Sequence, residues 1–219
     1  MKRTKLLALG LSAALTAGLL SGCGSSFSAA ELVKNNLDLI YLDQYSDEYL
    51  EETGLTAEQA QEMYTSGLET ETEYFAEIFN VDLDTCGDDI KQQIVDLYAQ
   101  IYTHSKYEVG TETRSGDTYL VELTVYPMDI IQKIIDEDAD AFNSDMQARS
   151  DAGEFENMTE EEYEVTWAQS VIDLVSARLD SIDYLDAQTI SVQVVKDDDG
   201  LYAIDDSDFQ RIDSLMISY

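Results

Sequence analysis

The chain has 219 residues and carries 46 acidic against 12 basic residues, a formal net charge of −34. Apolar residues make up 44 % of it and aromatic residues 10 %, enough to build a core, so the composition excludes a wholly disordered chain. The acid excess excludes a nucleic-acid partner, because contacts to phosphates need Lys and Arg.

The first 22 residues are predicted to be a signal peptide. Lys2, Arg3 and Lys5 form a basic start, and the apolar stretch 6–20 follows. This stretch is shorter than the ~20 residues that a helix needs to span a bilayer. No later segment is long and apolar enough to do so, and the pattern is therefore typical of a secreted chain.

The residues Leu20-Ser21-Gly22-Cys23 come next, and they resemble the lipobox of bacterial lipoprotein precursors. The resemblance implies cleavage between Gly22 and Cys23 and a diacylglyceryl thioether, carrying fatty acids such as palmitate, on Cys23. Its two acyl chains are enough for stable anchoring. An ordinary signal peptide with an incidental cysteine is the alternative.

Processing at this point would divide the chain into three parts. Residues 1–22 are the signal peptide, residues 23–27 are the lipidated cysteine with a short tether, and residues 28–219 are one acidic domain. The removed part holds three basic and no acidic residues, so the charge becomes −37. Such a domain is repelled by anionic headgroups, and the lipid must hold it at the membrane. We expect it on the extracytoplasmic face of the cell membrane, in a Gram-positive bacterium.

Helices are predicted where a capping residue precedes apolar residues spaced three and four apart. Ser28, Thr56 and Thr159 each precede a Glu or Gln by three residues, the capping-box spacing. The helix after Thr159 is expected to be the longest and to reach Ile182. In the region 128–149 the apolar stripe comprises Ile131, Ile134, Ile135 and Phe142. The full set of expected helices covers residues 28–41, 56–79, 88–102, 128–149, 159–182 and 209–216, with a turn or brief helix over 43–53.

Two β-hairpins are predicted from alternating apolar residues on either side of a turn. The first joins strands near 107–111 and 119–125 through the turn 114–117, and the second joins 190–194 and 201–204 through 197–200. Together they would form a small four-stranded antiparallel sheet, with several long amphipathic helices covering its apolar face. The predicted fold class is α+β, in a single domain.

The order of these elements also resembles a group of surface lipoproteins of Firmicutes that has no established activity. The resemblance covers nearly the whole processed chain and implies fold and location only. The closing hairpin is also similar to that of cystatin-like and nuclear-transport-factor-like α+β folds. The residues that carry the resemblance, besides the lipobox, are Leu55–Ala60, Tyr107–Gly110, Gly116–Val121 and Asp199–Ile204.

No catalytic set of residues stands out in the sequence. His104 is the one histidine, and we interpret it as a surface residue at a helix C-terminus, which the helix dipole favours. Cys86 is expected in a solvated or half-buried loop, where Asp84, Asp88 and Asp89 would disfavour a thiolate. Paired carboxylates for glycoside hydrolysis cannot be singled out among 46 acidic residues.

Calcium is the one cofactor that the acidic residues suggest. The segment starting at Asp82 begins like an EF-hand loop and then departs from it. Cys86 stands at position 5, which needs an oxygen ligand, Asp89 at position 8, where an apolar residue belongs, and Gln93 at position 12, which needs a bidentate carboxylate. Asp197, Asp198 and Asp199 form a candidate metal site in the second hairpin turn, with Asp205, Asp206 and Asp208 following. A solvated turn of an acidic protein explains the same residues.

The sequence thus favours a lipid-anchored cell-surface protein that binds an envelope protein or ligand and is not an enzyme. A carboxylate-dependent envelope hydrolase and a low-affinity calcium-binding surface protein remain as alternatives. Adaptation of the surface charge to a salty niche would account for the acidity without any site. A solute-binding subunit is disfavoured, because it needs parallel sheets, whereas the predicted strand pairs are hairpins. Five tyrosines of the N-terminal helices could form a protein-contact face or simply fill the core: Tyr41, Tyr45, Tyr49, Tyr64 and Tyr74.

Overall fold

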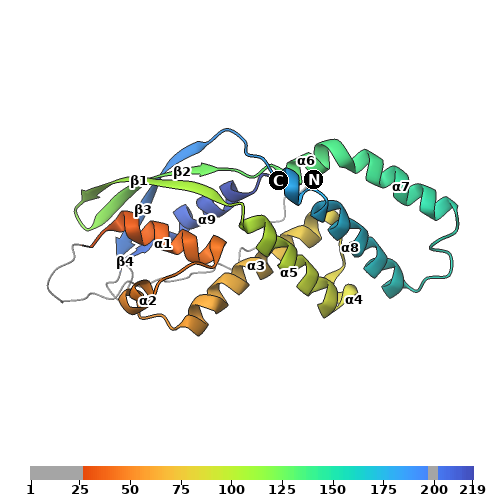
Figure 1. The fold of residues 1–219 in the computed structure, drawn as a ribbon, viewed down its shortest axis with the longest axis horizontal. Coiled ribbons are helices and arrows are strands. Elements are labelled where there is room, and N and C mark those ends of the chain that lie inside the picture. Colours follow the sequence, from red (N-terminus) through yellow and green to blue (C-terminus); the bar gives the residue numbers. More distant parts are fainter. Residues whose placement is uncertain (1–26, 197–201) are drawn as a thin grey trace.

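The computed structural model describes residues 27–196 and 202–219, in which a sheet lies at one end and a group of helices extends beyond it (Figure 1). The predicted single-domain α+β fold is confirmed. Among the described residues no helix is long and apolar enough to cross a membrane. The elements are α1 (Ala29–Leu42), α2 (Asp47–Thr53), α3 (Ala57–Phe79), α4 (Leu83–Cys86), α5 (Asp88–Tyr102), β1 (Lys106–Ser115), β2 (Thr118–Tyr126), α6 (Ile130–Lys133), α7 (Ala139–Asp151), α8 (Glu160–Ser176), β3 (Gln188–Lys196), β4 (Tyr202–Ile204) and α9 (Asp206–Met216).

The four strands form one antiparallel sheet in the order β1-β2-β3-β4. The first hairpin turns at Gly116, whose φ of 67° is the left-handed conformation that glycine adopts without strain. A β-bulge interrupts the pairing of β1 with β2 between Val109 and Glu112. The two predicted hairpins are therefore joined through the β2–β3 pair, and the turn of the second lies outside the described residues.

One face of the sheet is buried and the other is exposed. Alternate residues of β2 and β3 point inward, as the period-two pattern predicts. Helices α1 and α9 cover this face (Figure 1). The inward side chains, all without exposed surface, are Val121, Leu123, Val125, Val192 and Val194.

The predicted capping residues begin their helices. Thr56 and Thr159 each form a full capping box, with Gln59 and Glu162 as the reciprocal partners. Ser28 accepts a hydrogen bond from the amide of Glu31, three residues on. The start of α1 is also held by β1, because the amide of Ala30 donates to the Glu112 carboxylate at 2.7 Å.

The helical region predicted over 128–149 is interrupted by a π-helical turn, Ile134–Asp138, between α6 and α7. A π turn holds more residues than an α turn, and it therefore shifts the phase of the apolar stripe. Ile134 is buried, whereas Ile135 is 46 % exposed, so the prediction that Ile135 lies in the stripe is wrong. Arg178 holds this turn with a two-pronged ion pair to Asp138 at 2.7 and 2.6 Å.

The helix that begins at Glu160 is shorter than predicted. It ends at Ser176, and the segment Leu179–Ser181 is a 3-10 turn. The side chains of Leu179 and Ile182 still pack against the core, which explains why their spacing looked helical. Within the described residues α3, with 23 residues, is the longest helix.

Candidate functional site

A buried carboxylate, Glu71, lies where the sheet-covering helices meet the helical half of the molecule. It is on α3 and is 4 % exposed. Its Oε1 accepts a hydrogen bond from the Tyr102 hydroxyl of α5 at 2.7 Å. Its Oε2 accepts one from the hydroxyl of Tyr219, which follows α9. Both oxygens therefore have a partner inside the protein.

A second carboxylate, Asp213 of α9, adds its charge to this cluster. Its Oδ1 accepts a hydrogen bond from the Tyr41 hydroxyl of α1 at 3.1 Å. The rings of Tyr41 and Tyr102 meet edge to face at 5.1 Å, which links the two hydrogen-bonded pairs. Four segments, α1, α3, α5 and the C-terminal segment, are thus joined by two carboxylates and three tyrosines.

Burial sets the protonation of these groups. Burial, together with the negative charge of Asp213, raises the pKa of Glu71 to about 7, although the hydrogen bonds from Tyr219 and Tyr102 lower it. Burial also raises the pKa of Asp213, against a hydrogen bond from Tyr41. The three tyrosines have pKa values well above the usual 10.0, chiefly because their hydroxyls are shielded from water, and they remain donors. Tyr41 and Tyr102 are buried as whole residues, whereas Tyr219 is 46 % exposed.

Tyr98 of α5 is the least satisfied member of this region. It has no exposed surface, and its buried hydroxyl has no hydrogen-bond partner among the described residues. Burial and the charge of Glu71 raise its pKa, and the neighbouring Tyr219 hydroxyl opposes the change. A buried hydroxyl without a partner carries a desolvation penalty, so the cluster contains a polar group that does not stabilise the fold.

Sequence reasoning missed Glu71, although a signal for it exists. Leu68 and Phe75 belong to the apolar stripe of α3, and Glu71 is three residues after the first and four before the second. It therefore shares their buried face. A carboxylate inside an apolar stripe is the feature that would have singled it out among the many acidic residues.

Glu71 is suited to binding a proton near neutral pH. Together with Asp213 it also links helices inside the protein through hydrogen bonds to tyrosines. A carboxyl with a pKa of about 7 is also suited to general acid catalysis. Here, however, Glu71 is enclosed and both oxygens accept from tyrosines. Neither carboxylate lines the two surface hollows described below. In this conformation the two carboxylates connect α1, α3, α5 and the C-terminal segment through hydrogen bonds.

The site residues predicted from the sequence lie outside the described residues. These are Gly22 and Cys23 of the lipobox and the candidate metal site Asp197, Asp198 and Asp199, and they stay predictions. Within the described ranges no group of three or more His, Cys, Asp or Glu side chains is arranged to hold a metal ion.

Two of the acids that follow the second hairpin, Asp205 and Asp208, have structural roles. Asp205 caps α9 by accepting from the amide of Ser207 at 3.0 Å, and this bonding lowers its pKa. Asp208 is 5 % exposed, accepts from the amide of Gln193 at 2.7 Å and pairs with Arg211 at 2.9 Å. Calcium binding through Asp208 would have to break these bonds.

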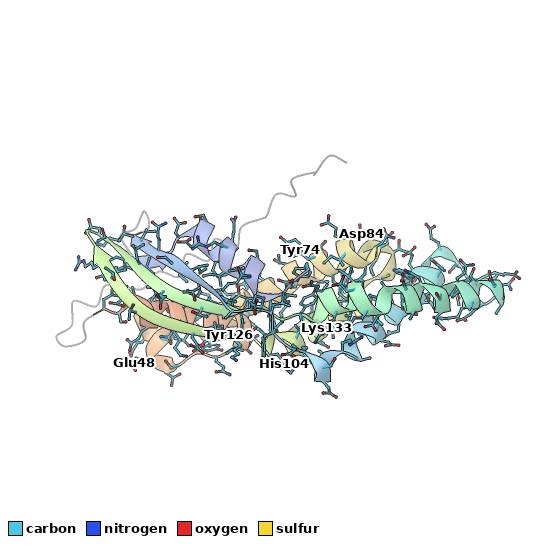
Figure 2. All side chains as sticks on the ribbon, turned by 90° about the horizontal axis from the view of Figure 1, so that it is seen from above. Glu48, Tyr74, Asp84, His104, Tyr126 and Lys133 are labelled. Atoms are coloured by element: carbon cyan, nitrogen blue, oxygen red, sulfur yellow. The ribbon has the colours of Figure 1, made fainter. Side chains whose placement is uncertain are left out.

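Cys86 differs from its prediction, whereas His104 is found where it was expected. Cys86 is buried at the end of α4, not in a loop, because α4 packs against α8. Burial raises the pKa of its thiol, with Glu164 and Asp82 adding to the effect. His104 is exposed just after α5 (Figure 2), and its carbonyl accepts from the Tyr184 hydroxyl at 2.7 Å.

The five N-terminal tyrosines do not form one contact face. Tyr41 and Tyr49 are buried in the core, at 1 % and 2 % exposure. Tyr45 and Tyr64 are half-buried and pack against it. Tyr74 is 38 % exposed and lies beside the ring of Tyr219 at 6.4 Å.

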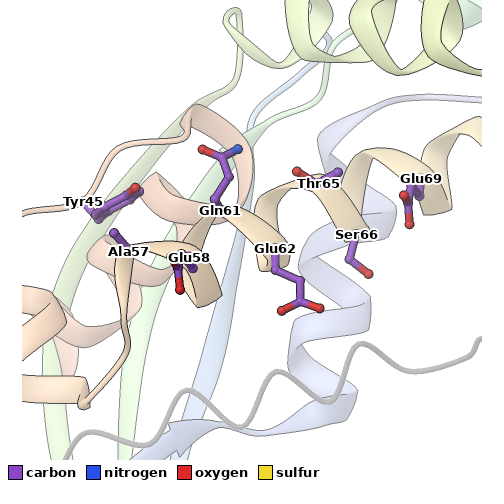
Figure 3. A pocket seen from close by; sticks show the side chains of 8 residues that line it. All are labelled: Tyr45, Ala57, Glu58, Gln61, Glu62, Thr65, Ser66 and Glu69. Atoms are coloured by element: carbon purple, nitrogen blue, oxygen red, sulfur yellow. The ribbon is translucent and has the colours of Figure 1, made fainter.

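Two shallow hollows occur on the described surface. The first, of about 670 Å³, runs along the outer side of α3 from Tyr45 to Glu69, and Figure 3 shows its mostly polar lining. The second, of about 540 Å³, lies between α1 and the start of β1. In it Lys34 pairs with Asp38, which also accepts from the Tyr107 hydroxyl at 2.7 Å. Its charges are thus partly satisfied within the protein.

The fold resembles one solved structure closely enough to compare. A protein of Bacillus subtilis, ycdA, whose crystal structure is described as that of "a putative lipoprotein", matches with a TM-score of 0.61 and 16 % identity. The match covers 87 % of this chain and 56 % of that one, so this chain spans little more than half of its length. Such low identity shows a shared fold alone. No family model and no curated protein matches the sequence.

Proposed function

We propose that this chain is a lipid-anchored protein of the bacterial cell surface, whose acidic domain acts by binding an envelope protein or ligand. The observation that carries the proposal is the sequence Leu20-Ser21-Gly22-Cys23 after a short apolar stretch. The first described residue, Phe27, comes only four residues after Cys23 and already packs against the sheet. A lipid on Cys23 would therefore hold the domain next to the membrane.

The shared fold gives independent support for this location. The Bacillus subtilis protein of similar fold is described as "a putative lipoprotein", and the likeness rests on the fold rather than on the lipobox. The more detailed resemblance of the closing hairpin to cystatin-like and nuclear-transport-factor-like folds stays a prediction.

Replacement of the cysteine tests the anchor. Cells producing the wild-type chain, Cys23→Ala or Cys86→Ala are grown with labelled palmitate and then fractionated. We expect label and membrane association for the wild type and for Cys86→Ala, and neither for Cys23→Ala, because only Cys23 follows the lipobox. Labelled, membrane-bound Cys23→Ala would contradict the proposal.

The preference for binding over catalysis rests on the engagement of Glu71. The carboxyl whose pKa best suits acid catalysis is buried and bonded to two tyrosines. We therefore expect the purified lipidated chain to release no soluble fragments from peptidoglycan or surface polysaccharide. Fragment release that Glu71→Gln abolishes, while the exposed Glu73→Gln does not, would establish the hydrolase alternative instead.

A further inference from the structure

The start of the described chain is fastened to one end of the sheet. The ring of Phe27 stacks on that of Tyr202 at 4.4 Å with an interplanar angle of 21°. It also meets the ring of Tyr119 edge to face at 5.2 Å. Tyr119 and Tyr202 are 8 % and 6 % exposed, whereas Phe27 is 37 % exposed and lies on top of them.

A second set of contacts holds the same segment one and three residues after Phe27. The Glu112 carboxylate of β1 accepts from the amide of Ala30 at 2.7 Å and from the hydroxyl of Ser28 at 3.1 Å. The chain therefore enters the domain at a fixed point, with ring stacking on one side and hydrogen bonds on the other.

Two cations accompany the aromatic residues at this end. The Arg114 guanidinium lies over the ring of Tyr119 at 5.4 Å, and the Lys196 ammonium lies over the ring of Tyr202 at 5.3 Å. Both residues are exposed. Aromatic rings beside Lys and Arg are typical of protein surfaces that meet lipid headgroups. We name this set the sheet-end cluster: Phe27, Arg114, Tyr119, Lys196 and Tyr202.

The reach of the tether places this cluster beside the bilayer. Phe27 is four residues after Cys23, and four residues of fully extended chain span about 14 Å. Helices α7 and α8 reach the opposite end of the long axis from the β1–β2 turn (Figure 1). Because anionic headgroups repel an acidic domain, an orientation in which the long axis of the domain lies along the membrane surface is disfavoured.

We propose that the sheet-end cluster is the membrane-facing surface, and that the α7–α8 end points away from the bilayer into the envelope. This inference rests on the lipid anchor of the proposed function. It adds the orientation, and it identifies the lipid headgroup layer as the partner of the cluster.

Energy transfer from tryptophan to a dansyl headgroup lipid tests the orientation. The lipidated chain is purified from membranes in a Trp167→Phe background and reconstituted in phosphatidylcholine–phosphatidylglycerol vesicles. The single tryptophan is then placed at the sheet end by Phe27→Trp or at the start of α8 by Tyr163→Trp. The two sites are matched, because the original side chains are aromatic and 37 % and 39 % exposed. Circular dichroism checks that each variant is folded.

We expect transfer to be several-fold stronger from position 27 than from position 163. Glu112→Ala removes the hydrogen bonds to Ser28 and Ala30 and should reduce this difference. Glu108 lies on the same strand and accepts a hydrogen bond from Tyr126 instead, so Glu108→Ala should leave the difference unchanged. Equal transfer from both positions would overturn the orientation, and equal behaviour of Glu112→Ala and Glu108→Ala would overturn the fixed entry point. If mass spectrometry finds no diacylglyceryl group on Cys23, it is the proposed anchor that fails.

Discussion

The substitution Glu71→Gln should change how stability depends on pH. The pKa of Glu71 is raised on folding, so the native state keeps a proton that the unfolded chain has already released. The resulting stabilisation is fully present below the unfolded pKa of 4.5 and is lost as the pH rises through about 7. Gln stays neutral at every pH, and the variant lacks this contribution to the pH dependence.

The size of the effect follows from the difference between the two pKa values. A carboxyl whose pKa rises from 4.5 to about 7 on folding holds its proton more tightly in the native state by about 3 kcal/mol. Glu71 is 4 % exposed, so solvent screening reduces this little. Between pH 5 and pH 8 the wild type should therefore lose roughly 2–3 kcal/mol more stability than Glu71→Gln.

Urea denaturation followed by the fluorescence of Trp167 measures the difference. Unfolding free energies are determined at several pH values from 5 to 8, about the range over which the carboxyl titrates, at constant ionic strength. Glu73→Gln, an exposed position on the same helix, removes the same charge and controls for the general repulsion of an acidic chain. Parallel pH profiles for the wild type and Glu71→Gln would refute the reasoning, because they would mean that the buried carboxyl has an ordinary pKa.

Three further predictions concern buried groups. Tyr102→Phe should lower the free energy of unfolding by roughly 1.5–3 kcal/mol at pH 8, because it removes a hydrogen bond to a buried carboxylate. Tyr98→Phe should lower it by less than about 1 kcal/mol, since the Tyr98 hydroxyl has no partner in the described chain. Equal losses for the two variants in urea titrations would contradict this. Ile134→Ala should lower the free energy of unfolding by about 2–5 kcal/mol, because Ile134 is buried, and Ile135→Ala should change it little, because Ile135 is exposed. A lower thermal midpoint for Ile135→Ala than for Ile134→Ala would exclude the π-helical turn. Cys86 should react with a maleimide far more slowly in the native protein than in urea, since the thiol is buried and its pKa is raised; fast native labelling would place it on the surface.

Most helices and both hairpins could be predicted because their signals are local. The capping residues Ser28, Thr56 and Thr159 bond to amides three residues on, and those bonds form whatever surrounds the helix. Alternation along β2 and β3 likewise specifies which side chains face the core. The errors occurred where distant partners decide. Examples are the π-helical turn next to Arg178 and the burial of Cys86 by α8. The predicted end of α8 at Ile182 is a further error, since Leu179 and Ile182 pack against the core without belonging to that helix.

The sequence by itself determined the lipobox, the acidic composition and the α+β order of elements, since each depends on neighbouring residues or on sums over the chain. Only the tertiary structure brought Glu71 to Tyr219, 148 residues away, and Asp213 to Tyr41, 172 residues away. The same holds for Phe27 and Tyr202 at the sheet end. The apolar stripe of α3 could indicate that Glu71 is buried, but its hydrogen-bond partners lie far along the chain, and they complete the environment that makes this carboxylate distinctive.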